Sequence, residues 1–244
     1  MSEARVRLFV DHPLGQGQSL PLTDAQAHYL FGVMRLVAGD GVLVFNGRDG
    51  EWLARVAEAG RRKGLLACAA QTRAQDMPPD LWLLFAPIKK ARTDFIVEKA
   101  VELGVRRILP VQTDFTNSER IRQDRLQAHA VEAAEQCGAT YVPEVADLVP
   151  LSRLLAGWDT GRALWFADEA AAHGDASVGS GNGAENGPAA ILIGPEGGFS
   201  PAERTRLRGL PFVHGLALGP RILRADTAAV AALTLWQARF GDWA

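Results

Sequence analysis

The sequence predicts an α/β protein made of two units, a small β-rich unit over residues 1–75 and a larger unit over residues 76–244. Short apolar runs separated by turn residues fill the first stretch, which is typical of strands. Strand-like and helix-like segments then alternate, which indicates a mostly parallel sheet covered by helices. Two glycine-bearing loops follow strands near the C-terminus, where open parallel sheets bind their ligands.

Composition indicates a globular chain from a reducing compartment. Of its 244 residues, 48% are hydrophobic and 22% are charged, which is enough for one large core or two modest ones. Cys68 and Cys137 are too few for a disulfide framework and lack metal-ligand spacing. The N-terminus has no signal-type apolar region and no window is long enough to span a membrane. We therefore expect a cytoplasmic protein with no membrane span and no metal site.

The first unit reads as a small barrel with one helix. Strands are expected at residues 6–10, 42–45, 51–56 and 65–70. The helix should begin at Thr23, because residues 23–26 have the form of a capping box, and should extend to Leu36. Gly47 and Gly50 suit the positive φ angles of a hairpin loop between the two central strands.

The second unit begins after Pro78 and Pro79, because consecutive prolines end the preceding element. Strands are expected at residues 81–86, 107–111, 163–166, 190–193 and 215–218, and helices at residues 93–103 and 122–137. Gly104 and Gly138 stand where glycines end helices. Residues 174–188 are rich in Gly, Ser, Asn and Ala, so they are expected to form a flexible loop.

The first glycine loop covers residues 194–199. A helix should follow it, since Ser200, Pro201 and Glu203 form a capping box with proline at the first helical position. The loop has neither the lysine of a P-loop nor the spacing of a dinucleotide fold. Glu196 disfavours a polyphosphate and suits a ligand with positive charge, hydroxyls and amino groups, such as S-adenosylmethionine. A tight turn with an exposed glutamate accounts for these residues equally well.

The second glycine loop covers residues 219–227 and precedes an alanine-rich helix, with Asp226 or Thr227 as the expected N-cap. Two such loops would sit side by side at one edge of a parallel sheet and could enclose one ligand. The alanines allow close approach of another backbone, within the fold or across a dimer interface. Core packing explains them as well.

Motifs in both units together resemble one family, the RsmE ribosomal RNA uridine N3-methyltransferases of the SPOUT superfamily. They are residues 7–10, 28–30, 33–35, 99–105, 108–110 and 132–136, with residues 193–199 and 218–224 of the two glycine loops. The match covers nearly the whole chain. Asp226 stands where the family usually has Glu, and Cys137 stands where Ser is common.

The resemblance implies a PUA-like RNA-binding β-barrel followed by a SPOUT α/β domain with a C-terminal deep trefoil knot. It also implies S-adenosyl-L-methionine as cofactor, a homodimer, and methylation of one uridine in the decoding region of 16S rRNA, preferentially in the assembled 30S subunit. The cofactor-binding residues that we expect are Ile193, Gly194, Glu196, Gly197, Gly198, Leu218, Gly219, Ile222, Leu223 and Thr227.

Catalysis requires uridine N3 to lose a proton, which places negative charge on the ring oxygens. Arg221 and Arg224 are the leading candidates to stabilise that charge, and Asp226 is an outside candidate for the base. Either arginine could instead contact phosphate or pair with Glu196 or Asp226.

RNA contacts are expected from basic residues of both units. These candidates are Arg7, Arg35, Arg61, Arg62, Lys63, Lys89, Lys90 and Arg92. Solvated surface is the alternative for each, and the formal net charge of -2 gives no global basic signature. Two rival functions stay open: methylation of a ribose hydroxyl or a tRNA base, and RNA binding without catalysis.

Overall fold

The computed structural model describes residues 4, 6–60, 62–117, 120–168 and 187–244, and it divides into two compact units. The first unit is Met1–Met77 with Ala134–Val142, and the second is Pro78–Ala133 with Pro143–Ala244. Arg61 and all but the last two residues of the expected loop at 174–188 lie outside the described residues. No helix among the described residues is long and apolar enough to cross a membrane.

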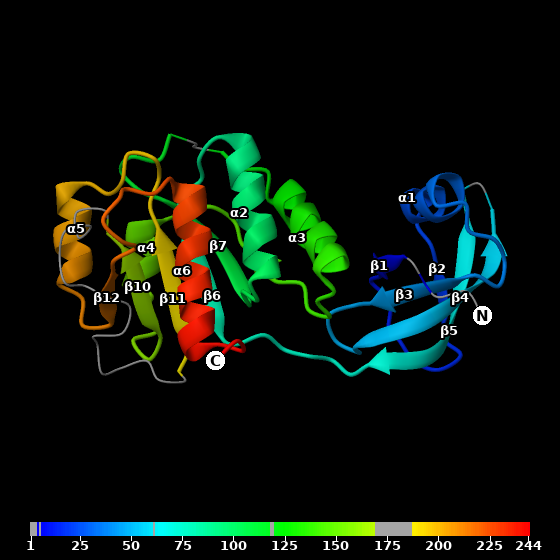
Figure 1. Ribbon diagram of the computed structural model, residues 1–244. Helices are drawn as coiled ribbons and strands as arrows, with labels where there is room; N and C mark the ends of the chain where they lie inside the picture. The colour runs from blue at the N-terminus through cyan, green and yellow to red at the C-terminus, as the bar shows by residue number, and fades with distance from the viewer. Residues whose placement is uncertain (1–3, 5, 61, 118–119, 169–186) are drawn as a thin grey trace. The chain divides into compact units, whose positions relative to one another are not determined.

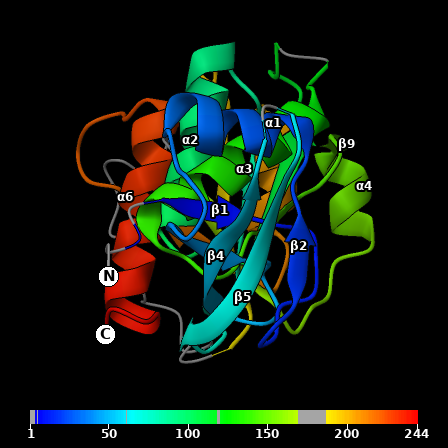
Figure 2. The same cartoon turned by 90° about the vertical axis from the view of Figure 1, so that its right-hand side faces the viewer.

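A curled five-stranded sheet forms the first unit, with the strand order β1-β3-β4-β5-β2. Its strands are β1 (Arg7–Phe9), β2 (Ser19–Pro21), β3 (Gly41–Phe45), β4 (Glu51–Ala59) and β5 (Gly64–Arg73). Register shifts between β4 and β5 interrupt their ladder and increase the local twist, and the curl of these long strands is visible in Figure 2. Strand β2 was not predicted, because it is only three residues long and includes a proline.

The helix of the first unit begins as predicted but changes type. Thr23 caps α1 (Asp24–Ala27) through the expected capping box with Gln26. A π-helical turn, η1 (His28–Val33), follows directly, so the helical segment ends three residues before the predicted Leu36. Arg35 has a left-handed backbone with φ of 57°, which the right-handed helix cannot accommodate.

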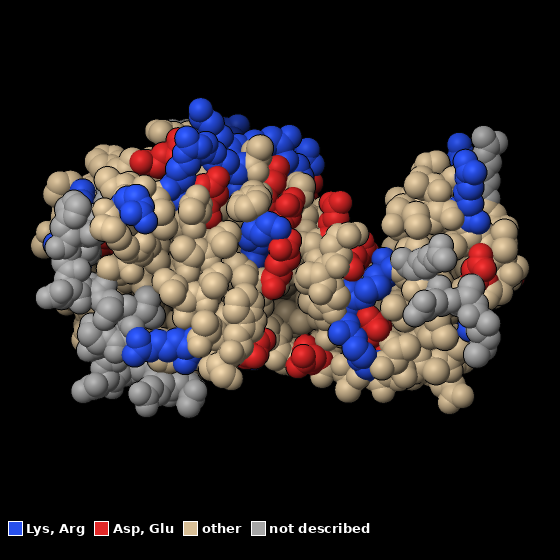
Figure 3. Space-filling model, viewed as in Figure 1, with Lys and Arg blue, Asp and Glu red and all other residues tan. Residues whose placement is uncertain are grey.

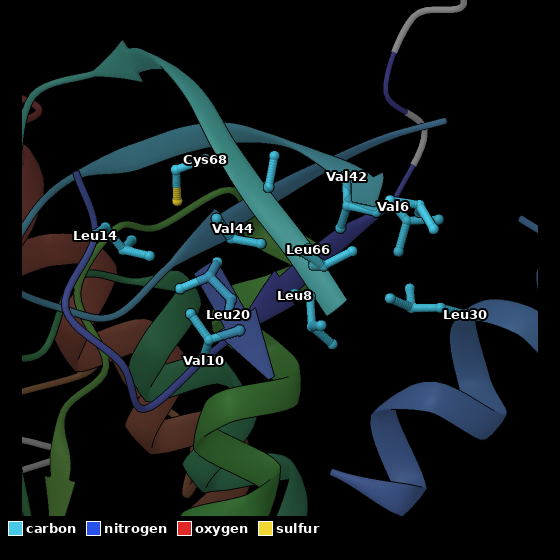
Figure 4. Close-up of a cluster of buried hydrophobic side chains, with 12 residues drawn as sticks. Val6, Leu8, Val10, Leu14, Leu20, Leu30, Val42, Val44, Leu66 and Cys68 are labelled. Carbon is cyan, nitrogen blue, oxygen red and sulfur yellow. The ribbon is translucent and has the colours of Figure 1, made fainter. Parts of the chain in front are cut away.

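Aliphatic side chains from every strand fill the first core (Figure 4). Leu20 of β2, Val42 and Val44 of β3 and Leu66 of β5 are fully buried. Each such side chain contributes about 1.5–3 kcal/mol through removal of its surface from water. Gly47 and Gly50 both have positive φ, so the predicted hairpin loop between β3 and β4 is confirmed.

A parallel sheet forms the second unit, with the strand order β12-β10-β11-β6-β7-β8 and with β9 beside β7 (Figure 1). Its strands are β6 (Leu81–Phe85), β7 (Arg107–Gln112), β8 (Glu144–Val145), β9 (Val149–Pro150), β10 (Ala163–Ala167), β11 (Ala189–Ile193) and β12 (Val213–Leu216). The predicted parallel pairing is confirmed. The strand expected at residues 215–218 ends two residues earlier.

Helices cover both faces of this sheet. They are α2 (Lys90–Glu102), α3 (Gln123–Cys137), α4 (Leu151–Ala156), α5 (Pro201–Arg208) and α6 (Ala225–Phe240). Helices α2 and α6 lie side by side (Figure 1). Leu151 and Leu155 of α4 and Leu207 of α5 pack with Leu84, Leu164 and other strand residues in the second core. Both faces of the strands are therefore apolar, as is usual for a parallel sheet. The knot implied by the resemblance stays a prediction.

Candidate functional site

A cavity of about 370 Å³ lies at the carboxyl ends of β10, β11 and β12, a size suited to one small molecule. Most of the predicted cofactor residues line it: Ile193, Gly194, Glu196, Gly198, Leu218, Gly219, Ile222 and Leu223. Arg92, Arg221 and Arg224 line it as well. Residues of both predicted glycine loops therefore line one cavity, and their role in binding the cofactor stays a prediction.

Two of the predicted cofactor residues do not line the cavity. Gly197 is exposed beside Phe115, and a Cβ placed on Gly197 would lie 3.5 Å from Cβ of Phe115, an ordinary contact. Thr227 is exposed in the first turn of α6. A pattern of neighbouring loop residues cannot tell which of them face inward, since that depends on the path of the backbone.

The first loop owes its shape to two glycines and a phenylalanine. Gly198 has φ of 67°, a conformation that other residues rarely adopt. A Cβ on Gly194 would lie 2.7 Å from the ring of Phe199, so only glycine fits there. Phe199 is buried against Phe166, with ring centroids 4.8 Å apart. Ser200 then starts α5 through the predicted capping box, which is confirmed.

The second loop leads into α6 earlier than predicted. Arg224 is the N-cap of α6, without a side-chain capping bond, so the expected N-cap at Asp226 or Thr227 was wrong. Asp226 instead lies in the first turn, where one carboxylate oxygen accepts a hydrogen bond from the backbone N of Thr227 at 2.9 Å. A carboxylate there is stabilised by the helix dipole, which explains why an acid follows the cap.

The two glycine loops are not direct neighbours, because β10 pairs with both β11 and β12. The end of β10 therefore supplies a third wall, which includes Ala167 and Asp168. Asp168 is buried and forms an ion pair with Arg208 of α5. Asp168 was not among the predicted site residues, although it lies just after the strand predicted at residues 163–166, and ligands bind where parallel strands end.

Opposite charges meet at the rim of the cavity. The Nη1 of Arg92 donates to Oε1 of Glu196 at 2.8 Å, and its Nε lies 3.6 Å from Oδ2 of Asp226. Arg221 and Arg224 are exposed. Within the described part of the chain, neither of them forms an ion pair. The pairing with Glu196 or Asp226 that was considered for these two arginines is made by Arg92.

Other basic residues lie close to this rim. Figure 3 shows Lys and Arg side chains gathered over the N-terminal end of α2. Lys89, the N-cap of α2, and Lys90, its first residue, are both exposed. The surface beside the cavity therefore suits a polyanion such as RNA.

The basic candidates of the first unit separate into two groups. Arg35, Arg62 and Lys63 are exposed and remain candidates for phosphate contacts. The side chain of Arg7 is only 13% exposed, and its Nε donates to Glu51 Oε2 at 2.6 Å. Its Nη1 and Nη2 donate to the backbone oxygens of Ala134 at 2.7 Å and Ala139 at 2.9 Å. Arg7 thus satisfies backbone carbonyls at and just after the end of α3, which makes it a poorer candidate for RNA contact than the exposed residues.

The described residues contain no group of three or more His, Cys, Asp or Glu side chains able to hold a metal ion. The cavity rim offers carboxylates and guanidinium groups instead. Its chemistry is therefore that of charge pairing and hydrogen bonding.

Family comparisons match both units. The family model of the RNA methyltransferase domain matches residues 75–237, and that of the RNA methyltransferase PUA domain matches residues 22–66. Ribosomal RNA small subunit methyltransferase E of Rickettsia conorii is 27% identical over 228 residues, which cover 93% of each chain. The protein of that name from Synechocystis is 30% identical over 222 residues, which cover 88% of this chain and 71% of the relative.

Solved structures agree with these sequence matches. Ribosomal RNA small subunit methyltransferase E from Neisseria gonorrhoeae, crystallised with S-adenosylmethionine, superposes with a TM-score of 0.88 at 25% identity and covers 98% of this chain and 99% of its own. A protein from Legionella pneumophila, described as a methyltransferase in complex with the same molecule, gives 0.86 at 28% identity over 99% and 100% of the two chains.

Proposed function

The chain belongs to the family of ribosomal RNA small subunit methyltransferase E, and from this premise we propose that it methylates N3 of a uridine in 16S rRNA. The methyl donor is S-adenosylmethionine, with which related structures were crystallised. One observation carries the proposal: two glycine loops enclose a cavity for one small molecule, and the arginines Arg221 and Arg224 at its rim form no ion pair with any described residue.

The residues of the cavity fit this cofactor. Gly194, Gly198 and Gly219 line the cavity without side chains, which leaves room there for the adenosine. Aliphatic side chains such as Ile193 and Leu218 suit the adenine ring. Glu196 supplies a carboxylate for a cationic or hydroxyl-bearing group. The bound cofactor supplies an electrophilic methyl group on sulfur.

The chain contributes positioning and charge stabilisation to the reaction. The uridine N3–H proton must leave, the N3–CH3 bond forms, and the S–CH3 bond breaks, which leaves neutral S-adenosylhomocysteine. As N3 is deprotonated, negative charge spreads to O2 and O4. Arg221 and Arg224 are exposed at the rim, so their guanidinium groups are free to stabilise that charge. Asp226 is engaged with Arg92, which makes it a poorer candidate for the base.

RNA is held, in this proposal, by exposed basic residues of both units: Arg35, Arg62, Lys63, Lys89 and Lys90. The match of residues 22–66 to an RNA methyltransferase PUA domain supports a role of the first unit in RNA binding. We further infer a cytoplasmic homodimer as the working unit. Exposed apolar residues such as Ile222 in the second loop and Leu235 on α6 would be covered in that dimer.

Nucleoside mass spectrometry of 16S rRNA tests the substrate, using cells with and without the gene. We expect 3-methyluridine to disappear from the rRNA without the gene and to return on complementation. Loss of a different methylated nucleoside would assign another substrate to the same cavity. If the methylated nucleosides are unchanged and titration calorimetry shows no binding of S-adenosylmethionine, the result would favour the alternative function, RNA binding without catalysis.

A further inference from the structure

Arg92 connects three segments that are far apart in the sequence. It lies in the first turn of α2, with its side chain 30% exposed. Its guanidinium group contacts Glu196 of the first loop at 2.8 Å and Asp226, just after the second loop, at 3.6 Å. A single side chain thus ties both walls of the cavity to α2.

Arginine is the residue suited to this arrangement. Its planar guanidinium group presents five N–H donors in a fixed geometry and can serve two carboxylates from different edges, whereas the ammonium group of lysine acts as a point charge. Without it, Glu196 and Asp226 would face each other's negative charge across the rim of the cavity. They would also be free to pair with Arg221 or Arg224, neither of which forms an ion pair in the described part of the chain.

We propose that Arg92 is a positioning residue, which acts through Glu196 and Asp226 to hold the two loops in the arrangement that binds the cofactor. The inference rests on the proposed function, because it takes the ligand of the cavity to be S-adenosylmethionine. It replaces the expectation that Arg92 contacts RNA phosphate. The exposed Lys89 and Lys90 lie beside it without such acidic partners in the described part of the chain, so they suit that role better.

Binding measurements on Arg92→Ala and Arg92→Lys distinguish a positioning role of Arg92 from direct contact with RNA phosphate. Loss of two partly exposed ion pairs should weaken S-adenosylmethionine binding about five- to tenfold in titration calorimetry, with a matching rise in its KM. The KM for RNA and its salt dependence should stay unchanged. A phosphate contact would do the opposite and reduce the slope of log K against log salt by about one. That outcome would overturn the proposal.

Coupling between Arg92 and Glu196 gives a second test. If Arg92 acts through the acids, Arg92→Ala in a Glu196→Gln background should weaken cofactor binding less than twofold further, because the main contact is already gone. Independent, multiplicative effects of the two changes would contradict the proposal. If Arg92→Ala folds poorly, Glu196→Gln still tests the contact from the other side, because it changes an exposed side chain of the first loop and should itself weaken binding.

Lys99→Ala is the matched control. Lys99 lies on the same helix and pairs with Glu102 at 2.6 Å, but it does not line the cavity. Its loss should leave cofactor binding unchanged. Wild-type protein that fails to bind S-adenosylmethionine would refute the proposed function itself. Wild-type binding that is matched by equal binding of the Arg92 variants would refute only the positioning role.

Discussion

At the scale of single residues, the rim of the cavity divides its charges into paired acids and unpaired arginines. Glu196 and Asp226 both contact Arg92, whereas Arg221 and Arg224 are exposed and without ion pairs in the described residues. A guanidinium group that forms no ion pair in the free protein is available to stabilise negative charge that develops in the transition state.

Arg224→Ala should therefore lower turnover far more than cofactor affinity. We expect kcat to fall on the order of a hundredfold, the usual cost of removing one charge-stabilising donor. The Kd for S-adenosylmethionine should change less than about twofold, because no charge partner in the protein is lost. Single-turnover methylation and calorimetry measure the two quantities. Arg153→Ala, on α4, is a control without expected effect, and a fall in affinity with unchanged kcat would show that Arg224 binds cofactor instead.

Glycines in the first loop should differ sharply in their tolerance of a side chain. Gly198 lines the cavity with φ of 67°, so Gly198→Ala introduces about 1 kcal/mol or more of strain directly at the ligand. Gly197 is exposed, and an added Cβ makes only an ordinary contact. Gly198→Ala should weaken cofactor binding about fivefold or more, and Gly197→Ala should hardly change it. If calorimetry shows that both variants lose the same cofactor affinity, Gly197 would belong to the cofactor site, as predicted from the sequence.

At the scale of elements, the two ends of β4 show how burial and pairing oppose each other. Glu51, at its start, is buried, which by itself would raise the pKa of the carboxyl group. Hydrogen bonds from Arg7, Thr72 and Arg73 outweigh burial and lower the pKa below its usual 4.5. Glu58, near the end of the strand, is exposed, so it provides a control within the same element.

Acid should therefore remove the stabilisation that Glu51 provides. A carboxyl group whose pKa is lower in the folded state stabilises fully above its unfolded pKa of about 4.5, and loses this effect as the pH falls through the folded value. Glu51→Gln should cost about 2 kcal/mol of unfolding free energy at pH 7, and the difference from wild type should shrink as the pH falls below 4.5 toward the lower folded pKa. Urea denaturation of wild type and Glu51→Gln, at pH 7 and at an acidic pH, measures the difference in unfolding free energy. A Glu58→Gln variant should match wild type throughout, and a gap that widens in acid would refute the assignment.

At the scale of the whole molecule, local patterns predicted most elements but not the contacts that join distant segments. Both capping boxes, at Thr23 and Ser200, were predicted correctly because their hydrogen bonds close within four residues. The role of Arg7 depends on carbonyls 127 or more residues further along the chain, and no local pattern records them. The third cavity wall at Asp168 depends on β10 lying between β11 and β12. Strand order, like the partners of Arg7, is a property of the folded chain.

The division into units offers a prediction at this scale. The sequence placed a boundary near residue 75, but Ala134–Val142 belongs to the first unit together with Met1–Met77. A chain that ends at Met77 still contains both Arg7 and Glu51, which form an ion pair at 2.6 Å in the full chain. It lacks the oxygens of Ala134 and Ala139, to which Arg7 donates in the full chain.

Arg7→Lys should distinguish these two environments. Lysine can keep the ion pair with Glu51 but lacks the fork that reaches the carbonyls, so the full chain should lose about 1–2 kcal/mol, the cost of leaving buried carbonyls unpaired. The shortened chain, in which those carbonyls are absent, should change by less than about 0.5 kcal/mol. The shortened chain should itself have a lower thermal midpoint than the first unit of the full chain. The expected difference is about 4–8 °C for each kcal/mol of stability lost in a domain of this size. Hydrogen exchange of β3 and β4 measures both losses locally. Equal destabilisation of the two chains would show that Arg7 acts through Glu51 alone, and that residues 134–142 contribute nothing to the stability of the first sheet.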